Sequence, residues 1–116
     1  MEKTPLTFRQ KDLLLMPFPY SDLSQTKVRP VLVVSNDRYN AHSGDLIVCC
    51  VTSAISHEFY TVVLTPDSLE EGWITENCGV KTENIAKIDK SKVIKKIGRL
   101  KEKSFALVLE KIRMLF

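Results

Sequence analysis

The sequence predicts a mainly β domain, in which seven or so short antiparallel strands form a partly closed barrel and one helix ends the chain. Three observations lead to this fold class. Runs of β-branched and aromatic residues have the length of strands, and turn-forming segments with proline, glycine or polar residues separate them. A helical apolar stripe is confined to residues 101–116. Such a sheet, covered by one helix, is a stable small-domain architecture.

Size and composition are those of one globular domain. The chain has 116 residues, of which 44% are hydrophobic and 27% charged. No apolar run approaches the ~20 residues that a membrane-spanning helix needs, and Met1–Pro5 lacks the pattern of a signal peptide. We therefore expect a cytoplasmic protein without a membrane partner, with a flexible N-terminal segment at residues 1–11 and a single domain over residues 12–116.

The first predicted strand is the short apolar run Asp12–Met16. We expect residues 17–20 to stop it, because the two prolines there cannot donate hydrogen bonds to a ladder. The polar residues 21–27 that follow predict a loop, which leads to Arg29.

The two best-patterned strands are Val31–Val34 and Leu46–Val51, joined by a turn at Ser35–Asn40. Arg29 precedes the first of them and Thr52 ends the second. If the strands are antiparallel neighbours, those two ends lie at the same edge of the sheet. A cation and a hydroxyl on one rim suit a phosphate group.

The second half of the chain predicts three more strand regions before the helix. Phe59–Leu64 is β-branched and aromatic, and residues 65–72 predict a loop with at most one helical turn. Residues 73–79 are irregular, residues 80–88 alternate well enough for one or two short strands, and residues 93–98 give a last strand.

The final segment, residues 101–116, is the one convincing helix. Its apolar residues recur at helical spacing and form a single stripe that either covers the sheet or joins a dimer interface. The stripe consists of Phe105, Val108, Leu109, Ile112, Leu115 and Phe116.

The charge distribution leaves two interpretations open. The net charge is +3, and residues 81–103 carry nine basic and three acidic residues. This segregation fits either a polyanion-binding face or a solvated surface. The three cysteines and two histidines show no metal-ligand spacing, and no glycine-rich phosphate loop occurs. We expect no metal and no cofactor.

Five blocks in series resemble the MazF/PemK toxins, the ribonuclease halves of bacterial type II toxin–antitoxin pairs. The similarity covers residues 12–116 in order. The blocks are residues 12–23 (DLLLMPFPYSDL), 27–37 (KVRPVLVVSND), 51–53 (VTS), 88–91 (IDKS) and 96–100 (KIGRL).

This resemblance implies an SH3-like barrel, shared with CcdB-type toxins, that forms a homodimer and binds a cognate antitoxin. It implies a metal-independent, sequence-specific endoribonuclease that cleaves single-stranded mRNA and so inhibits translation. The family's key arginine falls on Arg29 and its key threonine on Thr52. An Arg and an Asp two residues apart in some members fall on Lys81 and Glu83, where this chain has lysine and glutamate instead.

The expected roles follow from the chemistry of RNA cleavage, in which the 2′-hydroxyl is the nucleophile. Arg29 would hold the phosphoryl oxygens and Thr52 would donate a hydrogen bond to the same phosphate. Glu83 is the candidate base, with His57 as its rival, and a 2′,3′-cyclic phosphate is the expected product. Ser53, His57 and Lys81 are expected to bind RNA, and Phe18 and, less strongly, Tyr20 to stack on bases. For each residue, a surface or core role is the alternative.

Two other functions remain open from the sequence. One is a non-enzymatic toxin of the same fold that poisons DNA gyrase by binding alone, which would not need the Arg29 and Thr52 pair. The other is an inactive RNA-binding barrel, which would show salt-sensitive RNA affinity without cleavage.

Overall fold

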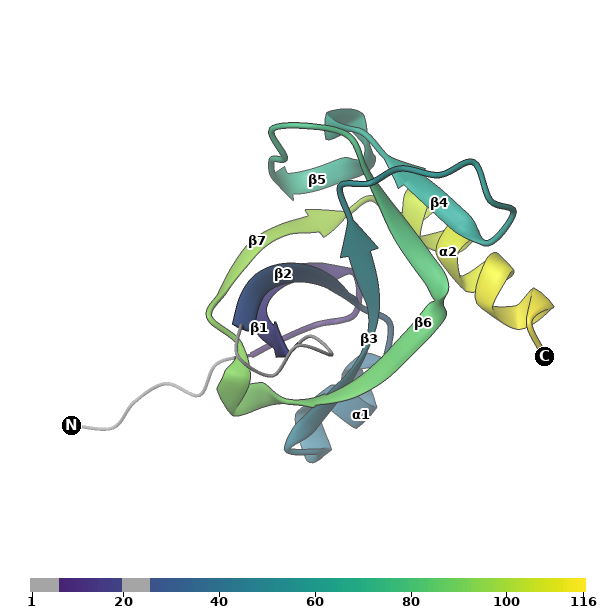
Figure 1. Ribbon diagram of the computed structural model, residues 1–116. Coiled ribbons are helices and arrows are strands. Elements are labelled where there is room, and N and C mark those ends of the chain that lie inside the picture. Colours follow the sequence, from purple (N-terminus) through teal and green to yellow (C-terminus); the bar gives the residue numbers. More distant parts are fainter. Residues whose placement is uncertain (1–6, 20–25) are drawn as a thin grey trace.

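The computed structural model describes residues 7–19 and 26–116, and within them seven strands form one antiparallel sheet in the order β4-β6-β3-β2-β1-β7-β5. Figure 1 shows how the sheet curls, so that β7 on one side and β3 and β6 on the other enclose β1 and β2. The strands are β1 (Asp12–Pro19), β2 (Thr26–Val33), β3 (Asp45–Thr52), β4 (Thr61–Leu64), β5 (Leu69–Gly72), β6 (Cys78–Asp89) and β7 (Lys95–Leu100). The helices are α1 (Asp37–His42) and α2 (Glu102–Met114), with 3-10 turns η1 (Pro66–Ser68) and η2 (Lys90–Lys92).

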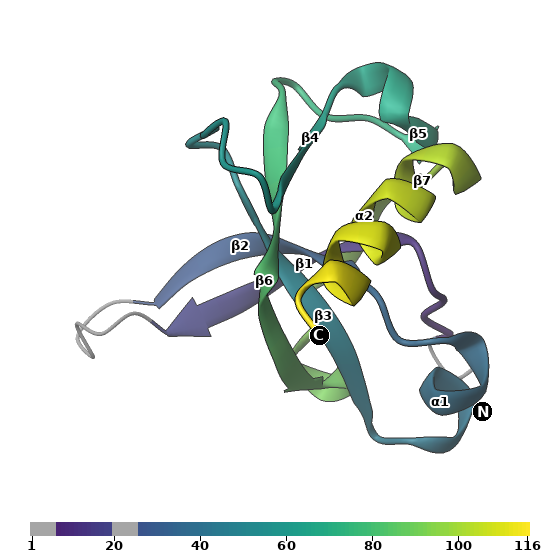
Figure 2. The same cartoon turned by 90° about the vertical axis from the view of Figure 1, so that its right-hand side faces the viewer.

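Two apolar clusters occupy the two faces of the curled sheet, because successive side chains of a strand point to opposite sides. In β2, Leu32 belongs to the first cluster, whereas Val31 and Val33 belong to the second. Helix α2 covers the first cluster with Phe105 and Val108, and Figure 2 shows it lying beside β4 and β6. The predicted pairing of the two central strands is confirmed, since β2 and β3 are antiparallel neighbours.

The prediction that the prolines end the first strand is wrong. Strand β1 continues through Pro17 to Pro19, which pairs with Thr26. The backbone of Leu15 faces β7, because its carbonyl accepts a hydrogen bond from the Ile94 N–H at 2.8 Å. Residues 17 and 19 face the same side, where pairing with β7 reaches only Leu15. The missing N–H groups of the two prolines would therefore have pointed to the edge of β1 that β7 does not pair with at this level, so no strand hydrogen bond is lost.

Helix α1 was expected as a turn. Its six residues carry no apolar stripe, so periodicity gives no signal for it. The Asn36 side chain caps it by accepting the Tyr39 N–H at 2.8 Å. The buried Asn40 side chain holds the helix to the preceding residues by donating to the Ser35 carbonyl at 2.9 Å. The Asn36 side chain therefore makes the expected turn into the start of a short helix.

Strand β5 was expected as loop, and β6 is one strand of 12 residues where one or two short strands were expected. Strand β5 is short and mostly exposed, and it forms because it pairs with the outer edge of β7. Its end, Gly72, has φ +72°, and a Cβ there would lie 2.1 Å from the Ile97 carbonyl oxygen. Only glycine permits this approach. The register of β6 against β3 shifts between Cys49 and Cys50, which bends β6 without breaking it.

The predicted C-terminal helix is confirmed, over Glu102–Met114. Phe105 and Val108 are buried, and Leu109 and Ile112 pack against the same cluster. Phe116 is an exception to the predicted stripe, because it lies beyond the helix end and is 96% exposed.

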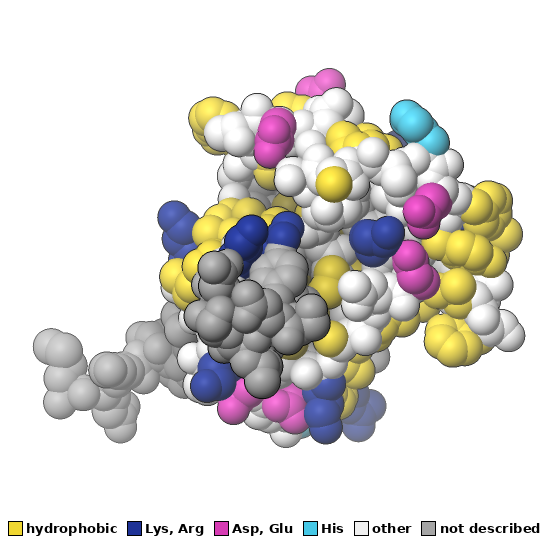
Figure 3. Space-filling view, in the orientation of Figure 1, with side chains coloured by type: hydrophobic (Ala, Val, Ile, Leu, Met, Phe, Trp, Pro, Cys, Tyr) yellow, Lys and Arg dark blue, Asp and Glu magenta, His cyan; other side chains and the backbone are white. Residues whose placement is uncertain are grey.

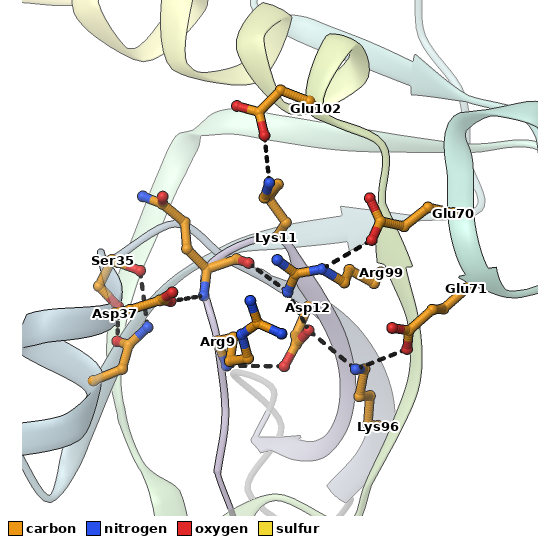
Figure 4. A network of polar contacts seen from close by, with 12 residues as sticks. Arg9, Lys11, Asp12, Ser35, Asp37, Glu70, Glu71, Lys96, Arg99 and Glu102 are labelled. Atoms are coloured by element: carbon orange, nitrogen blue, oxygen red, sulfur yellow. Dashed lines mark hydrogen bonds and ion pairs between the residues drawn. The ribbon is translucent and has the colours of Figure 1, made fainter.

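A buried ionic network joins the start of β1 to β5 and β7 (Figure 4). Asp12 is fully buried and accepts from Arg99 Nη1 at 3.1 Å and from the Arg9 backbone N–H at 2.9 Å. Arg99 also donates to the Gln10 carbonyl at 2.9 Å and lies 3.3 Å from Glu70. Because both groups are buried, each charge is tolerated in the interior only while the opposite charge of its partner compensates it.

Candidate active site

The register of β2 against β3 relates the predicted catalytic pair. Val31 pairs with Cys50, so the same register continued by two residues brings Arg29 opposite Thr52. The paired ladder stops at Val31 because Pro30 has no N–H with which to continue it. Thr52 is the last residue of β3, and both side chains are half-buried. The paired β2–β3 ladder thus ends two residues before the level of Arg29 and Thr52.

The pKa of the Cys50 thiol indicates which charges lie on the same face of the sheet. It lies in β3 between Val31 of β2 and Lys81 of β6, two residues before Thr52. Burial raises its pKa, whereas the nearby Arg29 guanidinium lowers it. The positive charge of Arg29 therefore acts on the face that carries Cys50 and Thr52, as strand alternation requires. Thr52 Oγ1 accepts the Ala54 N–H at 3.1 Å, so its own proton can be donated to a further acceptor.

Lys81 and Glu83 occupy the next strand on this face. Lys81 is half-buried, and its Nζ lies 3.7 Å from Glu83 Oε2 and 3.8 Å from Glu58 Oε2. The ammonium is thus shared between two carboxylates, one from β6 and one from the loop before β4. Figure 3 shows basic side chains with acidic ones beside them across the middle of this face.

The position of Glu58 depends on Thr82, a fully buried residue at the register shift of β6. Its Oγ1 and backbone N–H both donate to the Tyr60 carbonyl, at 2.6 and 3.2 Å. The Thr61 N–H in turn donates to the Glu58 carbonyl at 3.1 Å. Glu58 was not among the predicted site residues. Its only sequence signal is its place next to His57, and the strand register decides its contact with Lys81.

A groove of about 740 Å³ opens beside Arg29. Arg29 and Ser53 line it, so it continues from the candidate site. Trp73 also lines it and is 69% exposed, whereas its sequence context predicts only an irregular segment. The sequence offered one signal, a tryptophan among polar residues directly after a glycine.

The other predicted site residues are less closely connected. Ser53 and His57 are exposed in the segment after β3. Phe18 lies in β1 opposite Lys27, but its side chain is outside the described part of the structure, as is all of Tyr20. Glu83 is exposed, and among the described residues its recorded ion pair is with Lys81.

Within residues 7–19 and 26–116, no group of three or more His, Cys, Asp and Glu side chains is arranged to hold a metal ion. The three cysteines there are free thiols, with Cys49 and Cys78 buried and Cys50 half-buried. None of the helices in this part of the chain is long and apolar enough to cross a membrane.

Solved structures with the same fold cover nearly the whole chain. A MazE–MazF complex from Deinococcus radiodurans matches with a TM-score of 0.78 and 22% identity, covering 96% of each chain. An endoribonuclease in complex with its cognate antitoxin from a mycobacterial species matches with a TM-score of 0.75 and 17% identity, covering 91% of each chain. The Mycobacterium tuberculosis toxin MazF-mt6 has a TM-score of 0.67 and 18% identity, over 85% of this chain and 91% of that one. These likenesses confirm the predicted fold class.

At the level of sequence, no curated protein matches the chain. A sequence profile of PemK-like, MazF-like toxins matches residues 9–116, which takes in all five blocks of the predicted resemblance. With nearly the entire chain matched, it belongs to the PemK-like, MazF-like toxin family of type II toxin–antitoxin systems.

Proposed function

We propose that this chain is a toxin endoribonuclease that cuts single-stranded mRNA at a short preferred sequence, without a metal ion. Toxins of this family are generally endoribonucleases. The observation that carries the proposal for this chain is the β2–β3 register, which relates Arg29 to Thr52 across one strand spacing. A directly opposed antiparallel pair has Cα atoms ~4.5–5.5 Å apart, and the paired ladder ends at Val31, so a phosphate fits between the side chains.

In the proposed reaction, the 2′-hydroxyl oxygen attacks phosphorus and the bond from phosphorus to the 5′-oxygen breaks. Arg29 binds the non-bridging oxygens and stabilises the negative charge that builds on them, while Thr52 donates its hydroxyl proton as a hydrogen bond. A base takes the proton of the 2′-hydroxyl, and the leaving 5′-oxygen gains a proton. The products are a 2′,3′-cyclic phosphate and a 5′-hydroxyl end.

We assign the base to Glu83, with His57 as the rival. Glu83 lies two residues after Lys81, which pairs with Cys50, on the strand whose Gly79 pairs with Thr52. Its carboxylate is exposed and can exchange protons with solvent. Lys81 Nζ lies 3.7 Å from Glu83 Oε2, and we assign Lys81 to binding a neighbouring phosphate. His57 is exposed in the adjoining loop, and an imidazole is the side chain that most often acts as a general base in enzymes.

We further propose a homodimer that a cognate antitoxin inhibits, acting in the cytoplasm where mRNA is found. Two of the structures similar to this chain contain antitoxins, a MazE–MazF complex and an endoribonuclease with its cognate antitoxin. Exposed apolar side chains of α2, Leu107 and Met114, offer surface for a second copy. Light scattering of the purified protein tests the dimer directly.

The decisive experiment incubates the purified protein with a long single-stranded RNA in EDTA. Wild type should cut it, and each cut should leave a 3′ end that resists phosphatase until acid opens the cyclic phosphate. Arg29→Ala should slow cleavage about 100-fold or more, as removal of one oxyanion donor does in other enzymes. Thr52→Ala should also slow it strongly.

A matched control is Arg113→Ala, which removes an exposed arginine of α2 and should leave the rate unchanged. RNA that stays intact with wild type, or equal cutting by wild type and Arg29→Ala, would overturn the proposal. Separate Glu83→Gln and His57→Ala variants decide the base, since loss of the true base should slow cleavage and also remove the rise in rate on the acidic side of the pH–rate profile.

A further inference from the structure

Trp73 is exposed on a stretch of backbone that is anchored on both sides. It is the sole tryptophan of the chain, and 69% of its surface is accessible. The residue before it, Gly72, pairs with Gly98 of β7 in a contact too close for any side chain. The residue after it, Ile74, packs against the first apolar cluster. The backbone is anchored on both sides, so little backbone entropy is lost when something stacks on the indole.

The groove beneath Trp73 has unlike sides. Lys27 and Arg29 lie along the β2 side, and Glu76 lies on the Trp73 side. Between them the lining is mostly apolar, with Leu15, Ile74 and Ile97 among its residues. The basic side attracts phosphates and the acidic side repels them, so a bound nucleic-acid strand has one favoured orientation. Such a strand would place its backbone along β2 and its bases towards Trp73.

We infer that Trp73 is a base-stacking residue, and that the groove binds the bases of single-stranded RNA next to the Arg29–Thr52 pair. The inference rests on the proposed nuclease function for the identity of the strand. Three observations favour RNA as the occupant: the groove shares Arg29 and Ser53 with the candidate site, cations line one side, and a flat aromatic group stands on the other. Single-strand binders combine a basic track with aromatic stacking platforms in this way. The volume of about 740 Å³ falls within the range of sites that enclose small organic ligands.

The sole tryptophan makes the test direct, because all indole fluorescence comes from the groove. The probe is a 12-nucleotide 2′-O-methyl RNA, which has no free 2′-hydroxyl and therefore cannot be cut. Its binding is followed separately by the anisotropy of a terminal dye. We expect it to change the Trp73 emission on binding, and an abasic chain of the same length to bind more weakly and leave the emission unchanged. Indole emission that stays constant at saturating base-containing probe would overturn the inference.

Substitutions give an independent measure. Trp73→Ala should weaken binding of the probe about 5- to 150-fold, the range for loss of one stacked base, whereas Trp73→Phe should retain most of the affinity. Ile94→Ala removes another exposed apolar side chain, one that does not line the groove, and should leave binding unchanged. Equal affinity of wild type and Trp73→Ala would contradict the stacking role.

Two further outcomes would assign the groove to a protein instead. If Trp73 is already shielded from acrylamide in the protein without RNA, and becomes accessible on dilution, a second copy covers the groove. If the probe binds undiminished to Trp73→Ala while an antitoxin peptide loses affinity, the groove is a peptide site. Either result would overturn the inference. Since the probe cannot be cleaved, RNA binding by Trp73 can succeed or fail independently of whether the protein cuts RNA.

Discussion

The buried ion pair between Asp12 and Arg99 predicts that Asp12→Ala is strongly destabilising. The carboxylate is fully buried, and its loss leaves the Arg99 guanidinium, whose side chain is 7% exposed, without that partner in the interior. Breaking a buried pair from one side costs ~3–5 kcal/mol. Glu70, 3.3 Å from Arg99, is 45% exposed and compensates only in part. For a chain of 116 residues, this corresponds to a fall in Tm of about 12–20 °C.

Urea unfolding followed by circular dichroism measures this cost. Asp12→Ala should lower the midpoint with little change in slope, because the surface exposed on unfolding is nearly the same. Replacing both partners, in Asp12→Ala with Arg99→Met, should cost less than the sum of the single changes. Glu102→Gln is the matched control, because Glu102 pairs with Lys11 at the surface, where it is 82% exposed, and should give no measurable change. A decrease of less than about 1 kcal/mol in the free energy of unfolding of Asp12→Ala would refute the reasoning, since a buried cation that has lost its buried partner should cost more than that.

Two other predictions concern the central strands. Burial raises the pKa of Cys49 from 9.0 to about 12, so in the folded protein it stays a protonated thiol at pH 8. Peptide mapping after iodoacetamide should therefore find half-buried Cys50 modified before Cys49. The pKa of Cys49 is higher in the folded than in the unfolded protein, so its contribution to stability is complete below pH 9 and is lost as the pH rises towards 12. Cys49→Ala should therefore reduce the decline of the urea midpoint at alkaline pH. Thr82→Val removes the 2.6 Å hydroxyl bond to the Tyr60 carbonyl, and should cost about 1 kcal/mol and speed amide exchange in residues 54–60 while α2 is unaffected. Thr75→Val, an exposed threonine, is its control, and unchanged exchange in the loop of Thr82→Val would contradict the proposed anchoring of Glu58.

The sequence by itself determined the parts of this protein that depend on local patterns. The β-branched runs of β2 and β3 and the apolar stripe of α2 predict those elements, because hydrophobic periodicity is read along a single segment. The ordered blocks from residue 12 onwards likewise indicated the toxin family. The proposed Arg29 and Thr52 pair could be foreseen for the same reason, since it needs only two strands and their direction.

Tertiary structure decided the features in which one segment depends on a distant one. Strand β1 tolerates Pro17 and Pro19 only because its β7 edge has no partner there, and β5 is a strand only because β7 offers it one. The carboxylates on either side of Lys81 come from β6 and from a loop more than twenty residues earlier, brought together by the fold. The exposure of Trp73 depends on Gly72 contacting β7 and Ile74 entering the core. Hydrogen-bond partners and burial are properties of neighbours in space, and a pattern along the chain does not contain them.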